Sequence, residues 1–112
     1  MAKDDYHVIV YQILAYLYGC LKNGEDVDPE LLESDAIIAN INERYRLFIL
    51  ETLQNRGYIE GVVFKRIGKD IAKAVVDNCR ITPEGIEYLC DNSFMQKALD
   101  FLKDVKAIIP FA

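Results

Sequence analysis

The sequence has few of the residues on which metal binding and catalysis most often depend. In 112 residues it has one histidine, three cysteines and no tryptophan. The widely spaced cysteines and the remote histidine form no metal-ligand pattern. They are Cys20, Cys79, Cys90 and His7. We therefore expect no metal site, and the cysteines are predicted to be buried, unreactive thiols in a reducing compartment.

Catalytic motifs are also missing from the sequence. It contains no glycine-rich phosphate loop, no nucleophile elbow and no histidine paired with a carboxylate. The acidic residues between positions 25 and 35 are interpreted as solvated surface and as favourable charge at a helix start. The sequence thus predicts that the protein is not an enzyme, and it indicates no cofactor and no small-molecule ligand.

No apolar run approaches the roughly 20 residues that a membrane-spanning helix needs. The first five residues, MAKDD, lack the basic region and the cleavage site of a signal peptide. We expect a cytoplasmic protein without a membrane partner. Its hydrophobic content of 52% with 28% charged residues is typical of one folded domain rather than of a disordered chain.

The net charge of −5 is unevenly distributed along the chain. Residues 1–43 hold two basic residues against nine acidic ones, whereas residues 44–80 hold eight against four. Residues 81–112 hold three against five. Only the middle third is basic, so a local positive patch is expected on a protein whose overall field repels polyanions.

The first predicted helix, over residues 5–22, is apolar on two sides. One stripe has the spacing of a buried helix face. It consists of Tyr6, Val10, Ile13, Leu14, Leu17 and Leu21. The opposite face carries Val8, Tyr11, Ala15, Tyr18 and Gly19. Either the C-terminal helix of the same chain or a second copy in a homodimer must cover that second face.

Capping signals place four further helices. Asp28-Pro29-Glu30 starts a short helix within 29–39, and Asn42 caps a helix over 43–56. Thr82 before Pro83 starts a helix that runs to about residue 91.

The last helix is predicted over residues 94–108, with Ser93 and Gln96 as a capping box and Pro110 as its stop. Its buried face is predicted as Phe94, Ala98, Phe101, Leu102, Val105 and Ile109.

Between these helices, residues 58–67 are rich in β-branched and aromatic residues and predict a strand. Residues 69–77 fit a loop, a short helix or the start of a returning strand, and residues 78–82 close the hairpin.

This order predicts a mainly α fold with a small antiparallel hairpin, in the α+β class. It corresponds to a winged helix-turn-helix with an additional C-terminal helix, in a single domain over residues 1–112. A three-helix core occupies 1–57, the wing hairpin 58–82 and two C-terminal helices 83–112.

Three stretches of sequence then resemble a known family. They are QNRGYIEG at 54–61, RITPEGIEYL at 80–89 and Asn92-Ser93. In this order and spacing, together with the N-terminal tyrosine-rich helix, they resemble the YjcQ family of small winged-helix proteins from Gram-positive bacteria and their phages. The resemblance implies fold and biological setting, and no biochemical activity.

The first functional hypothesis is DNA binding, by a phage-related transcriptional regulator that acts as a dimer. In winged-helix folds the third helix enters the major groove and the wing touches the flanking backbone. The basic third of the chain coincides with these elements. The candidate DNA-binding residues are Arg44, Arg46, Asn55, Lys65, Arg66, Lys69 and Lys73.

The second hypothesis is a protein–protein interaction module without DNA binding. The outward face of the third helix carries Phe48 and Glu51, which suit a protein contact better than a DNA groove. The alternative is that Phe48 packs on a neighbouring helix. The candidate interface residues are Val8, Tyr11, Ala15, Gly19 and Phe48.

Overall fold

The computed structural model describes residues 5–33 and 41–105 of the chain, and its elements follow the predicted order. The helices are α1 (Tyr6–Asn23), α2 (Pro29–Glu33), α3 (Glu43–Asn55), α4 (Pro83–Asp91) and α5 (Ser93–Asp104). The strands are β1 (Ile59–Glu60), β2 (Val63–Ile67), β3 (Asp70–Val75) and β4 (Arg80–Ile81). The predicted α+β class, mostly helical with a small antiparallel hairpin, is confirmed.

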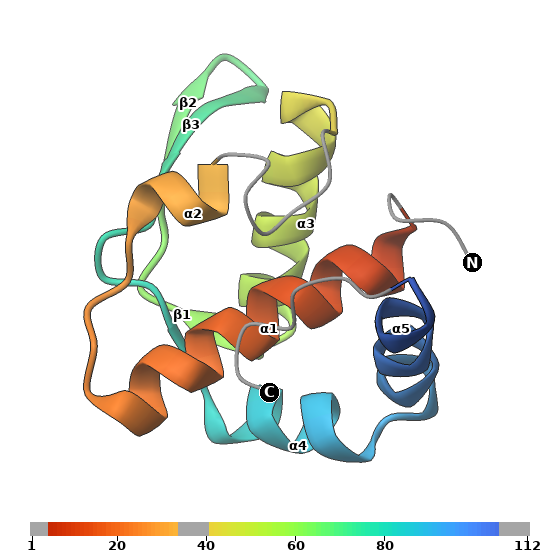
Figure 1. Ribbon diagram of the computed structural model, residues 1–112. Coiled ribbons are helices and arrows are strands. Elements are labelled where there is room, and N and C mark those ends of the chain that lie inside the picture. Colours follow the sequence, from red (N-terminus) through yellow and green to blue (C-terminus); the bar gives the residue numbers. More distant parts are fainter. Residues whose placement is uncertain (1–4, 34–40, 106–112) are drawn as a thin grey trace.

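Helix α1 is the centre of the fold. It lies between α4 and α5 on one side and α3 with the strands on the other (Figure 1). Val8 and Ala15, on its second apolar face, are fully buried. The helix ends at Gly24, whose φ of 66° is the left-handed conformation that glycine adopts without strain. The chain therefore buries most of both faces of α1 by itself, and Leu21 near the end of the predicted buried stripe is instead exposed.

This burial corrects the predicted partner interface. Val8, Tyr11, Ala15 and Gly19 are all buried within the chain and cannot form an exposed docking face. The physical reason is that the C-terminal helix α5 packs along α1. This helix, and not a second copy of the chain, therefore covers the second face of α1. Of the five candidate interface residues only Phe48 is exposed.

The strands form two short antiparallel ladders, one after the other along the same hairpin. β1 pairs with β4 at the base, and β2 pairs with β3 beyond it. Between the ladders Gly61 has a φ of 87°, and a Cβ there would lie 2.0 Å from the Asn78 carbonyl oxygen. The Gln54 side chain of α3 bonds both the N–H and the C=O of Val62 at this break, at 2.8 and 2.9 Å. The predicted strand over 58–67 is therefore two strands, and the undecided segment 69–77 contains the returning strand.

The β2–β3 hairpin contains a bulge that sets its two faces. Lys65 lies opposite Lys73, but Arg66 lies opposite Ile71, so Ala72 is the extra residue. Below the bulge Ala74 is buried and faces the core, while Lys65 and Lys73 share the outward face. Above the bulge, Arg66 and the half-buried Ile71 share the inward face.

Two caps agree with the sequence prediction. The Asn42 side chain accepts a hydrogen bond from the backbone N–H of Arg44, at 2.8 Å. The Thr82 hydroxyl oxygen accepts from the backbone N–H of Gly85 at 3.1 Å, and the same hydroxyl donates to the Gly57 carbonyl. The starts of α3 and α4 are thus fixed by local chemistry that is visible in the sequence.

The predicted start and buried face of the last helix are corrected. Asn92, not Ser93, caps α5, and its side chain accepts from the N–H groups of Phe94 and Met95. The buried stripe consists of Met95, Ala98 and Leu102, at spacings of three and four residues.

Phe94 and Val105, predicted to be buried in α5, are instead exposed. Phe94 lies one position off the buried stripe and stacks on His7 of α1, with ring centroids 4.4 Å apart. Ile109 and the stop at Pro110 lie outside the described residues.

The two capping assignments for α5 predict different effects on stability. Asn92→Ala removes the acceptor for the first N–H groups of the helix and should lower the free energy of unfolding by about 1 kcal/mol. Ser93→Ala, one residue later, should change it by only a few tenths of a kcal/mol, within about 0.5. Urea unfolding followed by circular dichroism measures both. A larger loss for Ser93→Ala than for Asn92→Ala would contradict the assignment.

Candidate nucleic-acid interface

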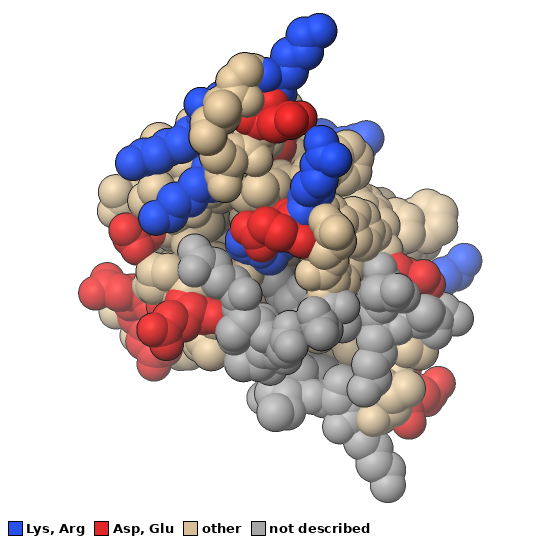
Figure 2. Space-filling view, turned by 90° about the horizontal axis from the view of Figure 1, so that it is seen from above, with Lys and Arg blue, Asp and Glu red and all other residues tan. Residues whose placement is uncertain are grey.

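The candidate DNA-binding residues divide into three groups in the structure. Lys65, Lys69 and Lys73 lie on the β2–β3 hairpin, and Arg44, Arg46 and Asn55 lie on α3, while Arg66 faces from the hairpin toward α3. They do not share one face. Figure 2 looks down on the hairpin end and shows basic side chains projecting there, with acidic side chains among them.

Two arginines are occupied in ion pairs that join α3 to the hairpin. Arg44 at the start of α3 pairs with Asp70 at the hairpin tip, at 3.3 Å. Arg66 on β2 pairs with Glu51 in the middle of α3. These pairs hold the hairpin beside α3 (Figure 1). Both predicted cations are thereby partly neutralised within the chain.

Arg46 has a structural role in this fold. Its side chain is only 10% exposed and pairs with Glu43 in the first turn of α3. The remaining guanidinium nitrogen, Nη1, donates to the Leu32 carbonyl of α2, at 3.4 Å. Arg46 therefore joins α2 to α3, and its prediction as a DNA contact is wrong because the guanidinium is turned into the protein.

The three lysines of the hairpin are exposed and make no ion pair with any described residue. Lys65 and Lys73 lie directly opposite each other across the ladder, and Lys69 lies in the turn. Like charges in opposed positions destabilise a hairpin. The outward face also exposes Val63 and Ile67, the latter 77% accessible at the tip. We call Lys65, Lys69 and Lys73 the lysine face.

The outward face of α3 is only partly open. Phe48 is 55% exposed and lies between two hollows, one of about 300 Å³ against the hairpin and one against α1 and α4. Asn55 is exposed at the last turn, eleven residues from Arg44 and therefore roughly 16 Å along the axis. The alternative that Phe48 packs fully on another helix is not what the structure shows.

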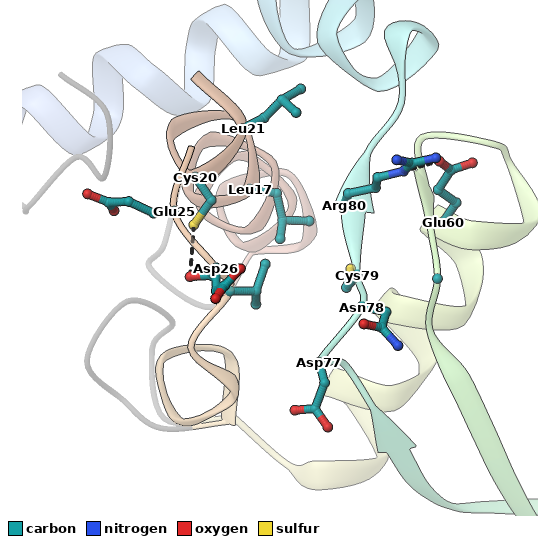
Figure 3. A pocket seen from close by; sticks show the side chains of 12 residues that line it. Leu17, Cys20, Leu21, Glu25, Asp26, Glu60, Asp77, Asn78, Cys79 and Arg80 are labelled. Carbon is teal, nitrogen blue, oxygen red and sulfur yellow. Dashed lines mark hydrogen bonds and ion pairs between the residues drawn. The ribbon is translucent and has the colours of Figure 1, made fainter. Parts of the chain in front are cut away.

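A separate hollow of about 560 Å³ has the opposite charge. It lies between the end of α1 with the following loop and the arms of β1 and β4 (Figure 3). Its acidic lining is Glu25, Asp26, Glu60 and Asp77. Arg80 pairs with Glu60, and the Cys20 thiol contacts the Asp26 carbonyl oxygen at 4.0 Å. The protein is therefore polarised, with this acidic hollow distinct from the lysine face.

The sequence predicted that all three cysteines are buried, but only two of them are. Cys20 and Cys79 are buried, and burial raises the pKa of the Cys79 thiol to about 12. Cys90 is exposed on α4, which corrects the prediction for that residue. Over residues 5–33 and 41–105, no group of three or more His, Cys, Asp or Glu residues is placed to hold a metal ion.

Sequence reasoning missed the acids that occupy the arginines and an aromatic cluster. Asp70 and Glu51 are separated in sequence from their partners by 26 and 15 residues. Tyr6, Tyr58 and Tyr88 come from three distant segments and meet beside α3. No local periodicity links such residues. The sequence signal was the tyrosine content, seven residues, which the prediction did not connect to one place.

These features define a small, mostly helical α+β protein with a lysine-bearing hairpin against its third helix. The YjcQ protein family matches residues 11–108, so the chain belongs to that family and the resemblance drawn from its motifs is confirmed. Neither the curated proteins nor the solved structures include a match to it. Among the described helices, none is both long and apolar enough to cross a membrane.

The thiols should differ in reactivity. In the folded protein iodoacetamide should alkylate the exposed Cys90 well before Cys79, because a pKa of about 12 leaves roughly one thiolate in ten thousand at about pH 8. Peptide mass spectrometry over time measures the order. In denaturant both cysteines should react at similar rates. Equal rates in the folded state would contradict the burial of Cys79.

Proposed function

We propose that this YjcQ-family protein is a winged-helix DNA-binding protein whose hairpin is the wing. The observation that carries the proposal is the lysine face. Three lysines that form no ion pair with any described residue gather on one hairpin of an acidic protein, and two of them are directly opposed despite their repulsion. A bound phosphate backbone would relieve that repulsion and release counterions.

The helix-to-hairpin ion pairs are compatible with this role. The side chains of Arg44 and Asp70 are 82% and 75% exposed. Such surface pairs contribute at most about 1 kcal/mol, so Arg44 can exchange Asp70 for a phosphate at little cost. Arg66 and Glu51 are less exposed and would keep the hairpin in place. On this basis the lysine face and Arg44 position the protein on the duplex.

The setting we propose follows the family resemblance, a cytoplasmic regulator related to phages. Base reading by α3 would involve Asn55, which is exposed and can pair with adenine. A dimer through α1 is not part of the proposal, because its second face is covered by α5.

The test is the salt dependence of binding to mixed-sequence duplex DNA, followed by fluorescence anisotropy. Lys65→Gln/Lys69→Gln/Lys73→Gln should weaken binding and reduce the slope of log affinity against log salt by about 2.7, if each lysine contacts one phosphate. The matched control is Lys22→Gln/Lys97→Gln/Lys103→Gln. It removes the same charge from α1 and α5 and should leave the slope unchanged.

Two results would overturn the proposal. One is no detectable binding of the unmodified protein at low salt. The other is an equal loss in both triple variants, which would show that total charge, and not the lysine face, governs the affinity.

A second candidate function is a protein interaction module that uses α3, favoured by the exposure of Phe48. An exposed aromatic between two hollows is typical of an interface anchor. The two functions separate cleanly in the DNA experiment. Phe48→Ala leaves every residue of the lysine face intact, so salt-dependent DNA binding that persists in this variant supports the first function.

A further inference from the structure

A second hollow lies on the other side of Phe48, apart from the lysine face. It is a pocket of about 350 Å³ between the first turn of α1, α3, α4 and Tyr58, the residue just before β1. Its lining is unusually aromatic for so small a volume. The lining residues are Tyr6, His7, Phe48, Thr52, Leu53, Arg56, Tyr58 and Tyr88.

The walls of this aromatic pocket are fixed by contacts among its own residues and with the start of α4. The Tyr58 and Tyr88 rings stack with centroids 4.5 Å apart and 18° between their planes. The Tyr58 N–H donates to the Leu53 carbonyl at 3.0 Å, and the Tyr58 carbonyl accepts from the Thr82 N–H at 3.1 Å. These bonds hold Tyr58 between the end of α3 and the start of α4.

Close packing of α4 completes that wall. Gly85 brings α4 so near that a Cβ there would lie 2.1 Å from the Tyr58 carbonyl oxygen. On the opposite wall His7 stacks on Phe94 at 4.4 Å and meets Tyr6 edge-on at 5.3 Å. A site whose rings are held in this way loses little conformational entropy when a ligand enters.

The charge in the pocket is of one sign. Arg56, the C-cap of α3, is exposed and makes no ion pair with a described residue. Its guanidinium opposes the effect of burial on Tyr6 and Tyr88, where burial raises the pKa of both phenols. No carboxylate is among the lining residues that the structure describes. The buried Nδ1 of His7 also has no hydrogen-bond partner there.

We infer that this pocket binds a planar aromatic carboxylate of one or two rings. Tyrosine and phenylalanine faces accommodate a flat apolar ring, and a single guanidinium matches a planar carboxylate with two parallel hydrogen bonds. The volume lies at the lower end of the range for small-molecule sites, which suits a ligand of this size. The site requires no DNA and stands apart from the proposed function.

The experiment is an NMR titration of the full chain with 2-naphthoate. We expect saturable shifts confined to the pocket, at Tyr6, Phe48, Tyr58 and Tyr88. Two further probes separate the contributions. 2-Naphthamide keeps the rings without the charge, and octanoate keeps the charge without the rings. Both should bind more weakly than 2-naphthoate.

Arg56→Gln should weaken 2-naphthoate binding by about tenfold, the loss expected for a charge-assisted hydrogen-bond pair, and should leave 2-naphthamide binding unchanged. The matched control is Arg44→Gln, which removes an exposed guanidinium from the other end of the same helix. It should leave 2-naphthoate affinity unchanged. Because Arg56 is exposed, folding should not suffer.

Three outcomes would overturn the inference. They are no saturable shift at millimolar 2-naphthoate, shifts centred on the lysine face instead of the pocket, and an equal loss of affinity in Arg56→Gln and Arg44→Gln.

Discussion

The burial of α1 is the constraint on which the rest of the structure depends. A helix that is apolar on both sides must be covered on both, and an 18-residue helix is too long for one neighbour to do so. α5 and α4 cover one side, and α3 with the strands covers the other. The C-terminal helix, which looks like an addition in the sequence, thus completes the core. It also removes the need for a second chain at α1.

Local chemistry was predictable, and long-range contacts were not. Asn42 and Thr82 were identified as caps because a cap depends only on the next few residues. Asn92 and Ser93 are both favourable N-cap residues, so the sequence does not distinguish them. The predicted cap was Ser93, and the cap in the structure is Asn92. The roles of Arg46 and Arg66 depend on acids and carbonyls that only the fold brings near. The aromatic pocket was missed for the same reason.

The basic residues are divided by type as well as by place. Arg56 makes no ion pair with a described residue, but the arginines at 44, 46, 66 and 80 are each paired with a carboxylate of the chain, whereas the three hairpin lysines pair with no acid in the described part. This division suits the chemistry of the two side chains. A guanidinium forms directional bonds that fix one element against another, and an ammonium on a flexible stem remains hydrated and adaptable. The paired arginines thereby hold elements of the fold together, whereas the hairpin lysines remain accessible to a ligand.

The bulge at Ala72 makes the hairpin asymmetric along its length. If Ala72 were paired with Arg66 in a continuous register, Ile71 would lie opposite Ile67 on the outward face; because Ala72 is bulged out, Ile71 pairs with Arg66 and turns toward α3. The base of the hairpin and its tip are therefore two segments with separate registers, joined at one residue. Deleting Ala72 would leave Ile71 opposite Arg66 in a regular ladder, so the side chains of the tip would keep their faces while the strand lost its local bend.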